Sequence, residues 1–110
     1  MGFGPAQGES TGGGGGGSTP LDVTTTTAAT YTLSDANDVL LINSAACTVT
    51  LHSAASAEKK LYQIVNIHST GVVTIDGDGT ETISGSQTQF LTTQWSSYTV
   101  VPDGTNFVIV

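Results

Sequence analysis

The sequence predicts a small all-β domain that follows a glycine-rich arm. From Leu21 to Val110, short runs of β-branched and aromatic residues alternate with clusters of Gly, Pro, Asp, Asn and Ser. Turn signals at intervals of about 8–12 residues are typical of all-β sandwiches and barrels. No helix is expected, because the only helix-favouring segment, 52–60, is too short, and no internal repeat of fixed period is evident. We therefore expect a sandwich or barrel-like domain of about seven or eight short strands over residues 21–110.

Residues 1–20 form a separate arm of low sequence complexity. Nine of the 14 glycines lie in it, and six of them are consecutive. This composition is typical of a flexible linker, but glycine also lets a backbone approach a partner closely. We expect the arm to dock onto a partner protein or onto neighbouring subunits. The expected docking residues are Met1, Phe3, Pro5, Gly12, Gly13, Gly14, Gly15, Gly16 and Gly17.

The strands are expected where β-forming residues run between turn signals. The run 39–42 is apolar throughout, as in a strand buried on both faces. Strict alternation over 47–51 predicts a strand with one apolar face. The C-terminal run 106–110 is too apolar to stay unpaired, so we expect it to pair within the sheet or across a subunit boundary. After an extended lead-in over 22–30, the expected strands are 31–33, 39–42, 47–51, 61–67, 72–76, 80–83, 95–101 and 106–110.

The stretch 71–85 has the clearest local pattern in the chain. Alternating β-branched residues lead into an Asp-Gly-Asp-Gly turn at 76–79, and a second short run follows. This order predicts a β-hairpin whose tip carries the carboxylates of Asp76, Asp78 and Glu81. Such oxygens are the ligands that calcium prefers, but the rest of an EF-hand loop is missing. We therefore favour a structural turn over a calcium site.

The composition excludes several classes of partner. A formal net charge of −7, with only two Lys or Arg residues, repels a phosphate backbone, so nucleic acid is not an expected partner. No signal-peptide pattern and no apolar run of about 18 residues occurs, so membrane insertion is not expected. A domain of this size buries only about 60–65% of its unfolded surface, and a single cysteine cannot form an internal disulfide. We therefore expect a multimer.

No residue pattern points to catalysis. Cys47 falls on the apolar side of its strand and has no identifiable base partner. His52 and His68 stand at turns, and neither has a second metal ligand at a suitable spacing. The glycine tract lacks the Lys-Ser/Thr ending of a phosphate-binding loop, and no serine stands in a Gly-x-Ser-x-Gly context. We therefore expect a protein that is not an enzyme and needs no cofactor.

Two aromatic residues, Trp95 and Tyr98, offer the one candidate ligand face. Together with Tyr62 and Phe107 they would line a surface for a sugar, because aromatic side chains combine an apolar ring with a polar atom. A small β domain also needs large residues in its core, and that interpretation explains the same aromatics. We favour the interpretation as core residues and keep the sugar-binding face as the alternative.

A set of short motifs, taken in order, resembles a small all-β module of tailed bacteriophages, found at the C-terminal ends of tail fibres and in short virion appendage proteins. The resemblance covers about residues 30–110. It is carried by Tyr31-Thr-Leu33, Asp38-Val-Leu-Leu-Ile42, Val49-Thr-Leu51, Ser53-Ala-Ala-Ser56, Leu61-Tyr-Gln-Ile64, Val73-Thr-Ile-Asp76, Glu81-Thr-Ile-Ser-Gly85, Ser97-Tyr-Thr-Val-Val101 and Asp103-Gly-Thr-Asn-Phe107.

The resemblance implies a homotrimeric component of the virion, made in the host cytoplasm and displayed on the particle. The chain departs from the module in having His52 where a proline is expected and Glu58-Lys59-Lys60 in a usually more neutral turn. It also lacks the long shaft that precedes the module in fibres. These departures favour a short appendage.

The sequence leads to three candidate functions. The first is a short trimeric tail-fibre-like appendage, which the arm anchors to tail or baseplate proteins and which presents the β domain to a host surface glycan. The second is a head decoration protein that bridges subunits of the major capsid protein. The third is a carbohydrate-binding module outside a particle. We favour the first, and the location on tail or head stays open.

Overall fold

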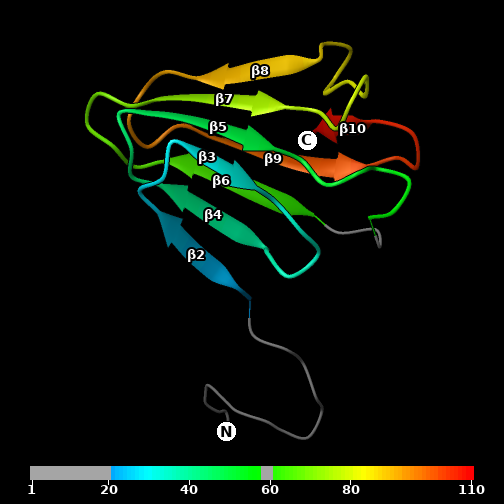
Figure 1. Ribbon diagram of the computed structural model, residues 1–110, viewed down its shortest axis with the longest axis horizontal. Helices are drawn as coiled ribbons and strands as arrows, with labels where there is room; N and C mark the ends of the chain where they lie inside the picture. The colour runs from blue at the N-terminus through cyan, green and yellow to red at the C-terminus, as the bar shows by residue number, and fades with distance from the viewer. Residues whose placement is uncertain (1–20, 58–60) are drawn as a thin grey trace, which may run out of the picture.

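The computed structural model describes residues 21–57 and 61–110, which form nine strands in two sheets (Figure 1). The all-β prediction is confirmed, and the described residues contain no helix that could span a membrane. The arm at 1–20 and the Glu58-Lys59-Lys60 turn lie outside the described residues. The strands are β2 (Val23–Thr26), β3 (Thr30–Thr32), β4 (Val39–Ile42), β5 (Ala46–Thr50), β6 (Tyr62–Asn66), β7 (Val72–Asp76), β8 (Thr88–Leu91), β9 (Ser97–Pro102) and β10 (Phe107–Ile109).

Consecutive strands alternate between the two sheets over the first part of the chain. In the five-stranded sheet, ordered β10-β9-β6-β4-β2, the strands β2, β4 and β6 are parallel neighbours. In the four-stranded sheet, ordered β3-β5-β7-β8, the strands β3, β5 and β7 are parallel in the same way. The chain therefore winds through three stacked coils, which is the topology of a short parallel β-solenoid. The antiparallel strands β8, β9 and β10 close one side of the stack.

The coils stack in register although their lengths differ. Val23 pairs with Val39, 16 positions later, and Val39 pairs with Gln63, 24 positions later. The loop 33–38 joins the first coil to the second, whereas the longer loop 51–61 joins the second to the third. A repeat therefore exists in space, but its period changes along the sequence. That change explains why no fixed period is evident from the sequence.

The core lies between the facing sheets and is formed by alternate residues of each strand. The alternation expected over 47–51 is confirmed, since Cys47, Val49 and Leu51 are all buried. The turn 53–57 also contributes Ala54 to the core. The remaining buried apolar residues are Leu33, Leu40, Ile42, Tyr62, Ile64, Val73, Ile75, Ile83, Leu91, Val100 and Phe107.

The hairpin expected at 71–85 is wrong in its second strand. Strand β7 pairs antiparallel with β8, not with 80–83, and Asp76 pairs with Thr88. The intervening residues 77–87 form a loop, closed by a hydrogen bond from the Gly77 N–H to the Gln87 carbonyl (3.0 Å). The chain leaves β7 because the side chain of Ile83 is buried in the core, where its backbone makes only isolated bridges.

The expected C-terminal strand does pair within the sheet, because β10 lies antiparallel to β9. The connections between strands gather at two ends of the solenoid (Figure 1). We call one end the loop end; it carries 33–38, 51–57, 77–87 and 103–106, together with the start of β2 and the end of β7, and lies at the right of Figure 1. We call the other the turn end; it carries 27–29, 43–45, 67–71 and 92–96 and lies at the left.

Candidate functional site

The charge of the described residues is confined to the loop end. The turn end contains no Asp, Glu, Lys or Arg. No Lys or Arg occurs anywhere in 21–57 and 61–110, so the described part of the loop end is uniformly acidic. Its carboxylates belong to Asp22, Asp35, Asp38, Asp76, Asp78, Glu81 and Asp103.

Within the acidic loop end, Glu81 has a structural role. Its carboxylate accepts hydrogen bonds from the Ala54 N–H (2.9 Å) and the Ser53 hydroxyl (3.3 Å). These bonds tie the loop 77–87 to the helical turn that starts at Ser53. Across the two described ranges, no group of three or more His, Cys, Asp or Glu side chains is arranged to hold a metal ion. Asp76, Asp78 and Glu81 therefore do not form such a group either.

Asp103 also serves its own turn. Its carboxylate accepts hydrogen bonds from the N–H groups of Thr105 (2.9 Å) and Asn106 (2.8 Å). These donors stabilise the charged form and so lower the pKa of Asp103. The side chain of Asp103, the first residue of the turn 103–106, therefore stabilises that turn.

A buried tyrosine joins the loop end to the core. The Tyr62 hydroxyl donates a hydrogen bond to Asp35 Oδ1 (2.7 Å), and His52 Nε2 lies 3.6 Å from Asp35 Oδ2. Burial raises the pKa of Tyr62, and the hydrogen bond and charge of Asp35 raise it further. The site therefore favours the neutral form of Tyr62 over the ionised form.

We expect this tyrosine to make the fold sensitive to alkali. Its folded pKa lies above the unfolded value of about 10, so its contribution is complete below that pH and is lost as the pH rises further. Urea unfolding between about pH 8 and pH 11 should show a steeper loss of stability in the wild-type protein than in Tyr62→Phe. Equal slopes for the two proteins would contradict this assignment.

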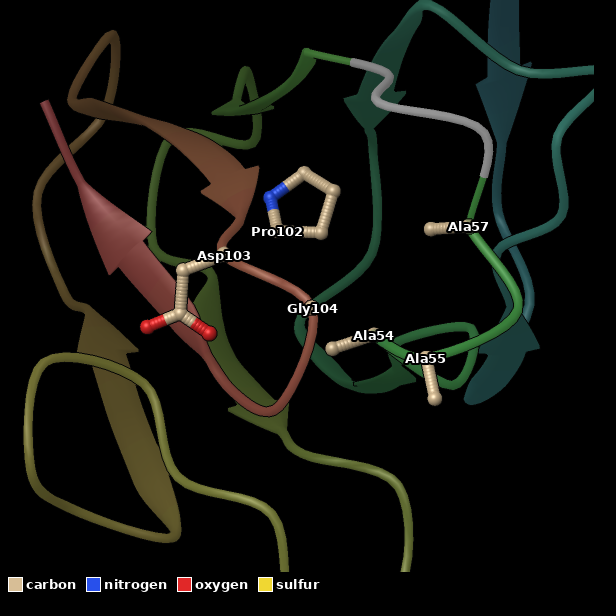
Figure 2. A pocket seen from close by; sticks show the side chains of 6 residues that line it. All are labelled: Ala54, Ala55, Ala57, Pro102, Asp103 and Gly104. Atoms are coloured by element: carbon tan, nitrogen blue, oxygen red, sulfur yellow. The ribbon is translucent and has the colours of Figure 1, made fainter.

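One open hollow of about 460 Å³ lies at the loop end, between the turn 54–57 and the turn 102–104 (Figure 2). Figure 2 shows three alanines on one side and the Pro102–Gly104 turn on the other. Its only charged side chain among the described residues is Asp103, whose carboxylate is already hydrogen-bonded within its own turn. The described lining therefore offers neither a nucleophile nor a base. The lining residues are Ala54, Ala55, Ala57, Pro102, Asp103 and Gly104.

The other candidate chemical groups of the sequence lie in different parts of the domain. Cys47 is buried in the core, and burial raises the pKa of its thiol. His52 lies at the loop end, whereas His68 lies at the turn end, where its Nδ1 accepts a hydrogen bond from the Thr70 N–H (3.1 Å). The structure does not bring these three residues together.

Trp95 and Tyr98 also lie apart. Tyr98 packs against the core from β9. Trp95 precedes β9 at the turn end, where 69% of its surface is exposed and its φ is +69°. Its N–H donates a hydrogen bond to the carbonyl of Asn66 (2.6 Å). The structure therefore separates the expected aromatic pair into one partly buried residue against the core and one exposed residue.

Asn66 organises the turn end around Trp95. The Asn66 side chain is completely buried, and its Nδ2 donates to the carbonyls of Gly71 (2.8 Å) and Leu91 (3.3 Å). Its Oδ1 accepts a hydrogen bond from the His68 N–H (3.2 Å). One side chain thus holds the turns 67–71 and 92–96 together.

The outward faces of the two sheets differ in composition. The face of the five-stranded sheet, which we call the aliphatic face, has no charged residue in its paired positions. The face of the four-stranded sheet, which we call the threonine face, aligns threonines of neighbouring strands and also carries Asp76 and Phe90. On the aliphatic face, the apolar residues Val23, Val39, Leu41, Val65, Val101 and Val108 lie among the uncharged polar residues Thr25, Gln63, Ser97 and Thr99; the aligned threonines of the threonine face are Thr30, Thr32, Thr48, Thr50, Thr74 and Thr88.

Neither face was predicted from the sequence. A signal was present in the Thr-x-Thr spacing of 30–32 and 48–50, which places both threonines of each pair on one side of a strand. Which side faces water depends on the pairing of the strands.

The sequence matches no family model, no curated protein and no solved structure.

Proposed function

We propose that this protein is a structural component of a bacteriophage particle, a short trimeric tail-fibre-like appendage that the arm at 1–20 anchors to other virion proteins. The observation that carries the proposal is the separation of charge from one side of the domain, the aliphatic face. The carboxylates gather at the loop end, whereas the aliphatic face has no charge. Such a side packs against neighbouring subunits without desolvating charges, and the acidic loop end keeps the assembly soluble.

Exposed apolar residues at both edges of the five-stranded sheet support a trimer. Leu21 and Val23 lie at the β2 edge, and Val108 and Val110 lie at the β10 edge; all four are exposed. Because β9 intervenes, β10 runs in the same direction as β2. The β10 edge of one copy therefore fits the β2 edge of the next in a head-to-tail contact, and in the proposed trimer the rotation between copies closes these contacts into a ring.

The lack of catalytic geometry among the described residues also supports a structural role for the protein. The hollow at the loop end is lined mainly by alanine and by a self-bonded aspartate turn. A binding or structural surface needs no such groups, whereas an enzyme needs a nucleophile, base or metal in a cleft. The protein as proposed therefore works through its surfaces.

Labelling and mass measurements test the proposal. Antibodies against the β domain should mark the tail in immuno-electron microscopy of the phage, at tens of copies per particle. Hundreds of copies on the head would favour the decoration protein instead. The native mass of the purified protein should be three times 11.1 kDa. A protein absent from purified particles would contradict the virion assignment, and a monomer would contradict the trimer.

A further inference from the structure

Trp95 occupies a backbone conformation that its own residue type disfavours. The other positive-φ residues of the described chain are the glycines Gly79, Gly85 and Gly104, together with Ser84. A bulky residue at positive φ is a real outlier, whereas glycine or asparagine adopts the same turn with little strain. The turn at 92–96 would therefore form more readily without a tryptophan. Strain of this kind gathers at functional sites.

The core gains little from the Trp95 side chain. With 69% of its surface exposed, the residue contributes much less packing than a buried aromatic would. Yet its backbone is fixed, because its N–H is bonded to Asn66 and the Gln94 side chain donates to the Ile67 carbonyl (3.2 Å). The result is an exposed indole on a well-anchored turn. Rigid, exposed aromatics of this kind are typical anchors of binding surfaces.

The surroundings of Trp95 indicate the chemistry of its ligand. The turn end has no Asp, Glu, Lys or Arg, and apart from His68 the polar side chains of the turns 43–45, 67–71 and 92–96 are hydroxyls and amides. Such a set matches a neutral ligand with many hydroxyl groups and an apolar face, which is the chemistry of a carbohydrate ring. The uncharged polar side chains of these turns are Asn43, Ser44, Ser69, Thr70, Thr92, Thr93, Gln94 and Ser96.

The turn end also points away from the attachment. The arm joins the domain just before β2, at the loop end, and β2 runs toward the turn end. From these observations we infer that Trp95 is the stacking platform of a binding site for neutral glycans at the distal end of the domain. The inference rests on the proposed function only for the idea that the glycan belongs to a host surface.

The chain contains a single tryptophan, so its fluorescence reports directly on this site. The full-length protein is titrated with soluble oligosaccharides of glucose, galactose, mannose and N-acetylglucosamine. We expect a saturable blue shift of the emission with at least one of them, because a stacked sugar removes water from the indole. No saturable change with any of the four would overturn the inference.

Two variants separate binding from folding, with isothermal calorimetry on the sugar that shifts the emission as the readout. Trp95→Gly should weaken binding more than tenfold while raising the melting temperature by a few degrees, since it relieves the positive φ. Phe90→Ala, which removes an exposed aromatic from the threonine face, should leave affinity within twofold. Unchanged affinity in Trp95→Gly, or a melting temperature well below the wild type, would overturn the assignment.

The outcomes also distinguish this inference from the proposed function. If antibodies detect the protein on the phage particle but it binds none of the sugars, the virion proposal stands and the glycan site is refuted. A protein that binds a sugar through Trp95 but is absent from particles is a carbohydrate-binding module, and the virion proposal fails.

Discussion

Replacing Phe107 by alanine is expected to lower the free energy of unfolding by about 3–5 kcal/mol, the usual cost of removing a buried aromatic. Phe107 is 1% exposed, and the centroid of its ring lies 6.1 Å from the centroid of the Tyr62 ring. Its N–H donates to the Thr82 carbonyl and its carbonyl accepts from the Ser84 N–H (both 2.9 Å), so it joins β10 to the loop 77–87. Loss of the ring therefore opens the closed side of the core.

Chemical denaturation in urea checks this prediction, with Phe107→Leu as the matched control. Leucine keeps most of the volume, so its cost should stay below about 1.5 kcal/mol. A loss smaller than about 1 kcal/mol in Phe107→Ala would mean that β10 does not pack on the core.

Replacing Asn66 by alanine is expected to cost about 3 kcal/mol, because two buried carbonyls and one N–H lose their partner at once. The carbonyls belong to Gly71 and Leu91, and the N–H belongs to His68. The space is tight as well, since a Cβ on Gly71 would lie 2.6 Å from the Ser44 carbonyl oxygen. The turn end therefore has little room to rearrange around the missing amide.

The matched control is Asn43→Ala, which removes an exposed amide from a neighbouring turn of the same end and should change stability by less than about 0.5 kcal/mol. Urea unfolding measures both variants. The single tryptophan provides a second readout, because Trp95 is hydrogen-bonded to the Asn66 backbone. Equal stability in the two variants would contradict the role assigned to Asn66 in holding the turn end together.

The positions of most strands could be predicted from the sequence, but their partners could not. The alternation at Cys47, Val49 and Leu51 indicates which residues face the core, and the structure confirms it. Alternation says nothing about whether a strand pairs with its neighbour in sequence or with a strand one coil away. The loop 51–61 adds to the difficulty, because its length hides the period of the coils.

The error at 80–83 has a similar cause. The Asp-Gly turn chemistry does reverse the chain locally, but over 78–81, as the hydrogen bond from the Glu81 N–H to the Asp78 carbonyl shows (2.9 Å). Tertiary packing decides the course of the chain beyond this turn, because Ile83 enters the core and bridges to Phe107. No local pattern carries that information.

The candidate site was predictable only in part. Trp95 stands out in the sequence by its residue type alone. Its pairing with Tyr98 failed because Trp95 lies in the turn before β9 and not in a strand, so the two side chains do not share a face. Its positive φ depends on how Asn66 holds the turn, and a single sequence does not encode that contact in any recognisable spacing.

The difference in length between the loops 33–38 and 51–61 makes this domain suited to peptide grafting. The register of β5 and β7 is the same kind of in-register pairing as that of β3 and β5, although the chain between them is longer. Lengthening a flexible loop twofold costs only about 0.6 kcal/mol in closure entropy. A foreign epitope inserted after Ala57 would therefore extend from the acidic end while leaving the coils and Trp95 undisturbed.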